Sequence, residues 1–357
     1  MITTDPVQTP QAPPTEACRV DIATEPPPWA PYLSASAGAT IYHDPRWGQV
    51  MNDAYGNVPF YLTARRGEAT VGVLPLVRQQ SLLFGRSLCS IPYFDAAGIL
   101  ADDAEAENQL LAAAGRLRDD CRASWVELRQ LTPPSDPLPA RTDKVTMWLD
   151  LPQGAEAMWK QLKTKVRTKV RKTQKGDLSI VHGGAELLDD FCDVYSRTMR
   201  DLGSPPHSRR FFRYVLEAFA EQADLFVVRG DNQVLAASFT LTDSHGFHVP
   251  WSGSDTRFRR LGANRFLYWC MLEHAADRGA GTFDFGRSTR DSGTYGFKKE
   301  WGAEPVPLHW HYLMPAGRQM PELRPDSPKY RLMVACWKKL PLLAARLLGP
   351  RIIAKLP

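Results

Sequence analysis

The segment LFVVRGDNQVLAASFTL, residues 225–241, predicts two β-strands joined by a tight turn. β-branched and aromatic residues lie on both sides of the polar turn at 230–232, a pattern typical of a β-hairpin. The segment FYLTARRGEATVGVLPL, residues 60–76, repeats this pattern around a turn at 66–68. Two hairpins of the same form indicate that the chain holds two copies of one unit.

The same series of elements follows each hairpin. A further β-type run comes next, then an amphipathic stretch of helix length, then a closing strand. These segments are 87–100, 105–121 and 124–131 in the first copy, and 244–255, 262–279 and 281–288 in the second. The duplication predicts an α/β (α+β) fold of two tandem domains, each a central mixed β-sheet flanked by helices.

Proline-rich segments mark the limits of these units. Prolines recur over the first ~30 residues and again at 132–141, and such composition resists regular structure. A chain of 357 residues is long enough for two domains. We therefore predict a disordered tail over 1–35, a first domain over 36–140, a second domain over 141–318 and a basic amphipathic segment over 319–357.

Composition and charge restrict the cellular compartment and the classes of binding partner that we expect. A net charge of +5 is too small for a general polyanion binder, so an anionic partner would meet a local patch, and no DNA partner is predicted. The six cysteines form no CxxC pair, and the N-terminus lacks a secretory pattern, which predicts a cytoplasmic protein without a metal site. The apolar run 332–356 is broken by Lys, Arg and Pro; it could lie on an anionic lipid surface or pack as a terminal helix.

The segment 160–176 is the most basic part of the chain, with eight cations and no carboxylate. Apolar residues at helical spacing predict a helix that lies on a core. Like charges three or four residues apart cost roughly 0.2–0.5 kcal/mol per pair, a cost that bound phosphates would relieve. A solvated basic face is the alternative. We predict contacts to an acceptor's phosphates from Lys165, Arg167, Lys169, Arg171, Lys172 and Lys175.

The loop before the amphipathic helix differs between the copies. A helix N-terminus binds phosphate when the backbone can be approached and no carboxylate competes. The second copy supplies Arg259, Arg260, Gly262 and Asn264 there, whereas the equivalent segment 102–107 of the first copy carries four carboxylates. Only the second copy is therefore predicted to bind an anionic donor.

The stretch FDFGRSTRDSGTYGFKKEWGA, residues 283–303, is the densest motif. Asp284 and Arg287 flank a strand end, where α/β sheets usually present their chemistry, and four glycines permit tight turns. A glycine-rich loop anchored by aromatic residues is the alternative. The chain has no GxSxG elbow, Walker loop or HExxH motif.

Several of these motifs resemble those of FemAB-type transferases. FDFGRS followed by GTYGFKKEWG is similar to their C-terminal signature, and RTKVRKTQKG (167–176) is similar to a helix end in the family. The loop at 259–264 resembles the loop of GNAT acyltransferases that holds the pyrophosphate of coenzyme A, with Asn264 in place of the last small residue. Over about residues 40–315 the chain looks most like the FemAB-related proteins associated with exosortase/PEP-CTERM systems.

The resemblance implies a tandem GNAT-like fold that transfers an acyl or aminoacyl group to an amine in a cleft between the domains. The implied donor is acyl-CoA or aminoacyl-tRNA. Acyl-CoA is favoured, because only a compact helical region lies between Lys175 and Phe226, where members that engage tRNA carry a long helical hairpin. The implied acceptor is an anionic small molecule or a lipid-linked glycan or peptide of exopolysaccharide or cell-envelope biosynthesis. A non-catalytic binder of polyanions or lipid-linked glycans is the alternative.

The resemblance also assigns roles. Lys298 matches the family's F-K lysine and would stabilise the oxyanion formed when an amine attacks the donor. Asp284 and Tyr295 are candidates for proton transfer, and Arg287 for donor binding. His245 and His248 share one orientation on a strand and could supply a base, or be structural.

Overall fold

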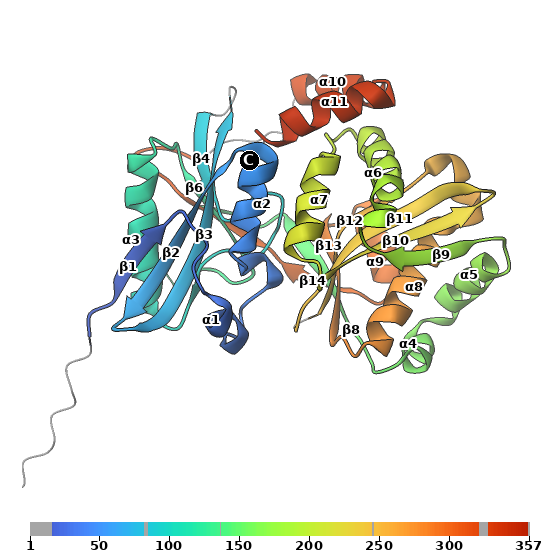
Figure 1. Ribbon diagram of the computed structural model, residues 1–357, viewed down its shortest axis with the longest axis horizontal. Helices are drawn as coiled ribbons and strands as arrows, with labels where there is room; N and C mark the ends of the chain where they lie inside the picture. The colour runs from blue at the N-terminus through green and yellow to red at the C-terminus, as the bar shows by residue number, and fades with distance from the viewer. Residues whose placement is uncertain (1–15, 82–84, 136, 245, 321–327, 356–357) are drawn as a thin grey trace, which may run out of the picture.

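Two β-sheets, each flanked by helices, lie side by side in the computed structural model (Figure 1), which describes residues 16–81, 85–135, 137–244, 246–320 and 328–355. In the described residues, the strand order is β1-β2-β3-β4-β6-β15-β7 in the first sheet, with β5 paired to β3, and β14-β8-β13-β12-β11-β10-β9 in the second. We call the first sheet with its helices the first domain and the second sheet with its helices the second domain.

The first half of the chain contains these elements: β1 (Arg19–Ala23), α1 (Ala30–Ala35), η1 (Ile41–His43), α2 (Arg46–Tyr55), β2 (Val58–Arg66), β3 (Ala69–Ser81), β4 (Gly85–Cys89), β5 (Leu100–Ala101), α3 (Ala104–Asp120), β6 (Val126–Gln130) and β7 (Ala140–Arg141).

The second half contains these: β8 (Lys144–Asp150), α4 (Ala155–Gln161), α5 (Thr164–Gln174), β9 (Ser179–Gly183), η2 (Ala185–Leu187), α6 (Leu188–Leu202), α7 (Arg209–Ala218), β10 (Ala223–Gly230), β11 (Gln233–Thr242), β12 (Phe247–Ser254), η3 (Thr256–Leu261), α8 (Ala263–Asp277), β13 (Thr282–Thr289), α9 (Gly293–Glu300), β14 (Glu304–Pro307), β15 (His309–Leu313), α10 (Pro328–Lys338) and α11 (Leu342–Ile353).

The two domains repeat one unit. The hairpins β2–β3 and β10–β11 are both antiparallel, and each is followed by a strand, a helix and a closing strand. In both copies the last two strands are parallel and pair over two residues only, β4 with β6 and β12 with β13. The predicted fold of two tandem mixed sheets flanked by helices is confirmed.

The N-terminal segment is more ordered than its prolines indicate. β1 pairs antiparallel with β2, and the indole of Trp29 is buried, with Nε1 donating to Thr63 Oγ1 at 2.9 Å. The expectation of a disordered tail over 1–35 is therefore wrong for residues 19–35, because the prolines at 26–28 lie between the strand and the helix. Residues 1–15 lie outside the described part of the chain.

The chain crosses between the sheets twice. After β7 it leaves the first sheet for β8 of the second, and after β14 it returns, so that β15 pairs with β6 and β7 in the first sheet. The predicted boundary near 140 lies at the first crossing. The predicted end of the second domain at 318 differs from the structure, because β15 (309–313) completes the first sheet.

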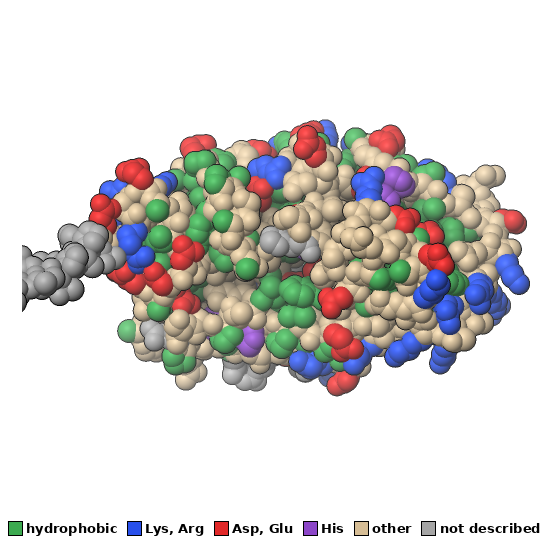
Figure 2. All heavy atoms as spheres, turned by 90° about the horizontal axis from the view of Figure 1, so that it is seen from below, with side chains coloured by type: hydrophobic (Ala, Val, Ile, Leu, Met, Phe, Trp, Pro, Cys, Tyr) green, Lys and Arg blue, Asp and Glu red, His purple; other side chains and the backbone are tan. Residues whose placement is uncertain are grey.

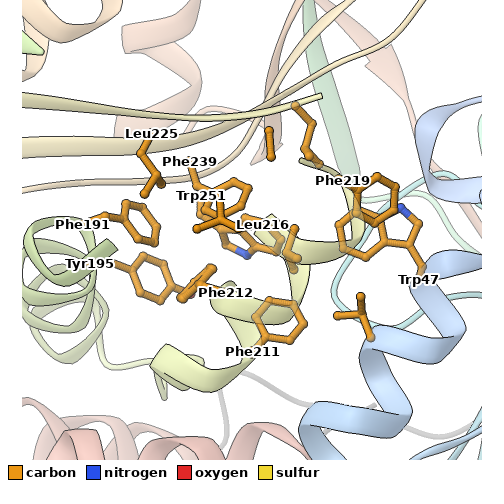
Figure 3. Close-up of a cluster of buried hydrophobic side chains, with 14 of the residues drawn as sticks. Trp47, Phe191, Tyr195, Phe211, Phe212, Leu216, Phe219, Leu225, Phe239 and Trp251 are labelled. Atoms are coloured by element: carbon orange, nitrogen blue, oxygen red, sulfur yellow. The ribbon is translucent and has the colours of Figure 1, made fainter. Parts of the chain in front are cut away.

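A core of aromatic side chains joins the domains (Figure 3). Trp47 of α2 is fully buried, and its ring centroid lies 4.4 Å from those of both Phe94 and Phe219. Trp251 and Phe211 of the second domain pack against the same cluster. Since the two domains share this core, their relative position is fixed by packing as well as by the crossing strands.

The last two helices, α10 and α11, pack on α6 at one end of the second domain (Figure 1). Trp337 Nε1 donates to Ser204 O at 3.0 Å, Ala345 is buried, and Arg346 forms an ion pair with Asp193. The predicted C-terminal segment 319–357 therefore contains two helices that pack on the fold. In the described part of the chain, no helix is long and apolar enough to cross a membrane.

Candidate active site

A bulge in β13 opens the second sheet. The pairing of β13 with β8 shifts between Asp284 and Arg287, and Gly286 has a φ of 75°, a conformation that glycine adopts readily. The Asp284 carboxylate holds this bulge, accepting from Gly286 N at 2.8 Å and from Thr146 Oγ1 at 2.6 Å. Since β12 and β13 pair only at Phe247↔Phe283 and His248↔Asp284, the two strands diverge beyond this point.

A cavity of about 380 Å³ lies where the strands diverge, between the two domains. Its walls include Tyr42, Phe94 and Asp95 from the first domain, and His248, Tyr268, Asp284, Arg287 and Lys298 from the second. Three residues singled out in the sequence, Asp284, Arg287 and Lys298, are therefore brought together here. We call this space the interdomain cavity.

Lys298 is buried at the wall of the interdomain cavity. Its Nζ donates to Gly286 O at 2.8 Å and to Arg287 O at 2.9 Å, both in the bulge of β13. Burial lowers the pKa of Lys298 to about 8, although the nearby Asp284 and Asp95 carboxylates favour the charged form. An ammonium has three N–H donors, so one is left for a group inside the cavity.

His248 lies between two carboxylates. Its Nε2 is 3.2 Å from Asp243 Oδ1, and its Nδ1 is 3.6 Å from Asp284 Oδ2. Burial acts to lower the pKa of His248, but the hydrogen bond with Asp243 and the charges of Asp243 and Asp284 outweigh it and raise the pKa to about 9. His248 in turn keeps the pKa of Asp284 below its usual value despite burial. His248 is thus an imidazolium at neutral pH, which favours a role in holding Asp284 over that of a base. His245 lies outside the described residues.

Arg287 spans the entrance between the domains. Its Nη1 donates to Asp95 Oδ1 at 2.8 Å, and its guanidinium lies 5.1 Å from the ring centroid of Trp310. The predicted donor-binding role thus falls on a residue that lines the cavity and also joins the two domains through an ion pair.

Tyr295, unlike Lys298, does not line the interdomain cavity. On α9, Thr294 and Lys298 are four residues apart and both line the interdomain cavity. Tyr295 instead packs against the core of the second domain, and Lys299 Nζ lies 5.9 Å from its ring centroid. This placement does not bring Tyr295 to the other candidate residues.

A second cavity, of about 460 Å³, lies at the N-terminus of α8. Lys169, Lys172 and Thr173 of α5 form one side, and Arg260 and Gly262 of the loop form another. The predicted donor loop and the predicted acceptor-phosphate helix therefore meet in one space, which we call the basic cavity. Figure 2 shows Lys and Arg side chains gathered at the end of the molecule where α5 lies.

Other members of the two predicted sets lie outside the lining of the basic cavity. They are Arg259, Asn264, Lys165, Arg167, Arg171 and Lys175.

Gly262 allows the basic cavity to form. It is the N-cap of α8, has a φ of 74°, and offers no side chain to the free N–H groups of the helix. A Cβ at this position would lie 2.6 Å from Thr173 Cγ2 of α5. The absence of a side chain therefore both brings α5 close and leaves the helix N-terminus open.

The equivalent helix in the first domain is closed by its own acids. Asp103 is the N-cap of α3 and accepts from Ala106 N at 2.9 Å. Arg66 pairs with Asp103 at 3.0 Å and with Glu105 at 2.6 Å. The two copies thus differ in geometry as their loops predict.

Part of the positive charge in the basic cavity is neutralised. Lys169 Nζ and Arg265 Nη2 both lie 3.0 Å from Glu300 Oε2, and these contacts lower the pKa of that carboxyl. Lys172 and Arg260 form no ion pair with the described residues, and the carboxylates of Asp177 and Asp231 line the same cavity. The lining therefore holds four cations and two carboxylates.

The two cavities are neighbours along α8. Arg265 lines the basic cavity and Tyr268 lines the interdomain cavity. Residues three apart on a helix face the same side, about 4.5 Å apart along the axis. A molecule whose anionic part lies at the N-terminus of α8 therefore has the interdomain cavity within one helical turn.

Sequence reasoning missed the residues that come from distant segments. Asp95 and Tyr42 carry no pattern that relates them to Lys298, and they line the same cavity only through the fold. Asp243 is brought to His248 in the same way. In the described residues, no group of three or more His, Cys, Asp or Glu could hold a metal ion.

Comparison with known proteins finds a family model that matches part of the second domain, and solved structures that share the fold. Residues 160–299 match the acetyltransferase (GNAT) domain family. The crystal structure of FemX is similar at 14% identity, with a TM-score of 0.62, over 85% of this chain and 97% of that one. A search of curated proteins finds no significant match.

Two further structures have the same arrangement. L-PGS from Bacillus licheniformis is 12% identical, with a TM-score of 0.52, over 92% of this chain and 99% of that one. A tandem GNAT protein from the clavulanic acid biosynthesis pathway is 11% identical, with a TM-score of 0.50, over 85% of this chain and all of that one. Residues 160–299 of the second domain thus match a GNAT acetyltransferase domain, and the whole chain has the fold of these solved structures.

Proposed function

We propose that this protein is an N-acyltransferase that moves an acyl or aminoacyl group from a phosphate-bearing donor to an amine in the interdomain cavity. One observation carries the proposal. The buried ammonium of Lys298 is held by two carbonyls of the β13 bulge, where β12 and β13 diverge, with one N–H available to the cavity.

The reaction needs a hydrogen-bond donor that stabilises the oxyanion formed during acyl transfer. The amine nitrogen attacks the carbonyl carbon of a thioester or ester, a C–N bond forms, and the carbonyl oxygen becomes negative. The remaining N–H of Lys298 would stabilise that oxygen in a buried setting. When the C–S or C–O bond breaks, Lys298, with a pKa of about 8, is suited to give a proton to the leaving group.

Asp284 has a positioning role in this proposal. One carboxylate oxygen accepts from Thr146 and Gly286, and the other faces His248. Because both oxygens are engaged, the carboxylate serves to hold the bulge whose carbonyls fix Lys298. The excess proton of the amine would pass to solvent, or to Lys298 once Lys298 has protonated the leaving group.

The basic cavity supports acyl-CoA as the donor. The open N-terminus of α8, together with Lys172 and Arg260, would bind the phosphates, and the acyl end would extend along α8 to Lys298. Between α5 and β10 the chain forms β9 and two helices that pack in the domain, with no long helical hairpin in the described residues. This compact region argues against aminoacyl-tRNA.

The acceptor in this proposal is an amine on an anionic or lipid-linked sugar or peptide precursor of exopolysaccharide or cell-envelope biosynthesis. It rests on the motif resemblance to the exosortase/PEP-CTERM-associated proteins. We propose the cytoplasmic side of the inner membrane as the place of action, because such precursors are assembled on membrane lipids.

A ligand-induced shift in melting temperature tests the donor. Acetyl-CoA at 100 times its Kd should stabilise the folded state by about 2.7 kcal/mol, whereas charged tRNA should stabilise it less. Arg260→Ala and Lys172→Ala, which change the basic cavity, should reduce the shift. The neighbouring Arg259→Ala and Arg171→Ala, outside the cavity lining, are the matched controls.

The proposal fails if acetyl-CoA gives the same shift in both pairs of variants. Stabilisation by glycan phosphates alone, without any response to acetyl-CoA or charged tRNA, would instead identify a non-catalytic binder with this fold.

A further inference from the structure

The C-terminal helix pair, α10 and α11, exposes an unusual number of large aliphatic side chains. Six of them are 39% to 70% exposed: Leu332, Met333, Leu343, Leu347, Leu348 and Ile352. Elsewhere in the described residues, exposed large hydrophobic side chains are scattered singly at Ile22, Val181, Leu202 and Leu261. Single exposed aliphatic residues are normal on a protein surface, but six of them on two consecutive helices indicate a contact surface.

The opposite face of the helix pair is firmly packed. Val334 lies against Gly203, Gly349 lies against Pro206, and Ala345 is fully buried. The indole of Trp337 donates to Ser204 O. In α11 the small residues Ala345 and Gly349 therefore face the protein and the large aliphatic ones face outward, the reverse of a helix that only covers a core.

The charge of this region is of one sign. From residue 327 to the last residue the sequence contains seven Lys or Arg and no Asp or Glu. Arg346 pairs with Asp193 of α6, whereas Arg331, Arg351 and Lys355 form no ion pair with the described residues. Aliphatic residues interspersed with unpaired cations are suited to a surface that is both apolar and negatively charged, which is an anionic lipid bilayer.

A shallow cavity of about 660 Å³ adjoins the aliphatic face. Arg210, Arg351 and Lys355 line it, with Asp53 as the one carboxylate in its lining. Three cations around a space next to Ile352 match the phosphate of a lipid headgroup whose acyl chains meet the aliphatic side chains.

The helix pair also touches the wall of the interdomain cavity. Tyr93 lines that cavity, and its hydroxyl donates to Ile353 O at 3.0 Å. Leu202 lines the same cavity and precedes Gly203, on which Val334 packs. A surface bound by the helix pair would therefore lie beside the cavity.

We propose that α10 and α11 dock this protein on an anionic bilayer, with the aliphatic face in the lipid and Arg351 and Lys355 on headgroup phosphates. The proposed membrane docking does not depend on the proposed acyl-transfer reaction. Its consequence rests on the proposed function: an acceptor carried by a lipid would be presented next to the interdomain cavity.

Vesicle sedimentation tests the docking. The full chain should sediment with vesicles of phosphatidylcholine and phosphatidylglycerol and not with phosphatidylcholine alone, and added salt should weaken binding. Leu343→Asn with Leu347→Asn, and separately Arg351→Glu with Lys355→Glu, should each weaken binding about tenfold or more. Val181→Asn with Ile22→Asn, exposed elsewhere, is the matched control, and unchanged melting temperatures show that the variants fold.

Three results would overturn the docking. They are absence of sedimentation with phosphatidylglycerol vesicles, equal binding by the helix-pair variants and the control, or a dimer in light scattering that Leu343→Asn with Leu347→Asn converts to monomer without any vesicle binding. Acyl transfer to a soluble amine should be unchanged in these variants. Loss of docking and loss of the reaction can thus be told apart.

Discussion

At the scale of single residues, two adjacent lysines show how position decides role. Lys298 is 7% exposed and bound to carbonyls of β13, whereas Lys299 is exposed and lies near Tyr295 and Glu304. Helical geometry turns neighbouring side chains by about 100°, so only one of the two lysines can face the cavity. From the sequence, Lys298 could be distinguished from Lys299 only because it matches the lysine of a family signature.

His248 leads to a prediction about pH and stability. Its folded-state pKa of about 9 lies above its usual value of 6.5, so its stabilising contribution is complete below pH 6.5 and is lost as pH rises toward 9. Lys298, whose pKa falls from 10.5 to about 8, acts in the opposite direction above pH 8. Between pH 6.5 and 8 the free energy of unfolding should therefore fall with pH, through His248.

Denaturant unfolding of wild-type protein and His248→Gln across that window measures this effect. The variant should be less stable at pH 6.5 and show a weaker dependence on pH. An identical pH slope in both proteins would mean that the Asp243–His248–Asp284 contacts do not hold a proton.

At the scale of elements, the regular parts of the unit could be predicted and the irregular parts could not. The β10–β11 turn has positive φ at Asp231 and Asn232, residue types that tolerate this conformation, so the sequence marked the hairpin correctly. β1 was missed because it is a five-residue edge strand close to prolines. Its pairing with β2 decides its structure, and no local pattern reveals that pairing.

The close contact between α5 and the N-terminus of α8 leads to a prediction about Gly262, and a second substitution in α5 should partly reverse its effect. Gly262→Ala puts a methyl group 2.6 Å from Thr173 Cγ2 at a φ of 74°. We expect a loss of about 1–3 kcal/mol in stability from strain and crowding, together with weaker acetyl-CoA binding.

Thr173→Ser removes the crowding methyl group and keeps the hydroxyl that donates to Val170 O. Added to Gly262→Ala, it should recover part of both losses, as measured by denaturant unfolding and by calorimetric titration with acetyl-CoA. If Thr173→Ser recovers nothing, close packing of α5 is not what Gly262 provides.

At the scale of the whole molecule, the two domains are packed and connected as one unit. Trp47 and Phe94 enter a core shared with Phe219 and Trp251, and β15 returns to the first sheet after the second is complete. Neither feature follows from local patterns, since periodicity marks a buried face without naming its partner. Three second-domain residues of the candidate site could be predicted because they share one short motif. The residues of the first domain that line the interdomain cavity could not be predicted, because they share no such motif.

The basic cavity is a similar case. The sequence indicated two anion-binding segments and assigned them to different molecules, the donor and the acceptor. The fold brings Lys172 and Arg260 to one cavity, so the two segments predicted to bind anions share one candidate site among the described residues. Charge patterns indicate which segments could bind anions, but the spatial relation of the segments comes from packing.

We propose that acyl transfer occurs in the interdomain cavity with Lys298 as the hydrogen-bond donor to the oxyanion. The most direct test is the rate of thiol release from acetyl-CoA with amine-bearing phosphosugars and peptides, for wild-type protein, Lys298→Ala and the matched control Lys299→Ala. Lys298→Ala should lower kcat by about 10²-fold or more with the Kd of acetyl-CoA unchanged, and Lys299→Ala should retain the wild-type rate. Equal rates in wild-type protein and Lys298→Ala would contradict the account.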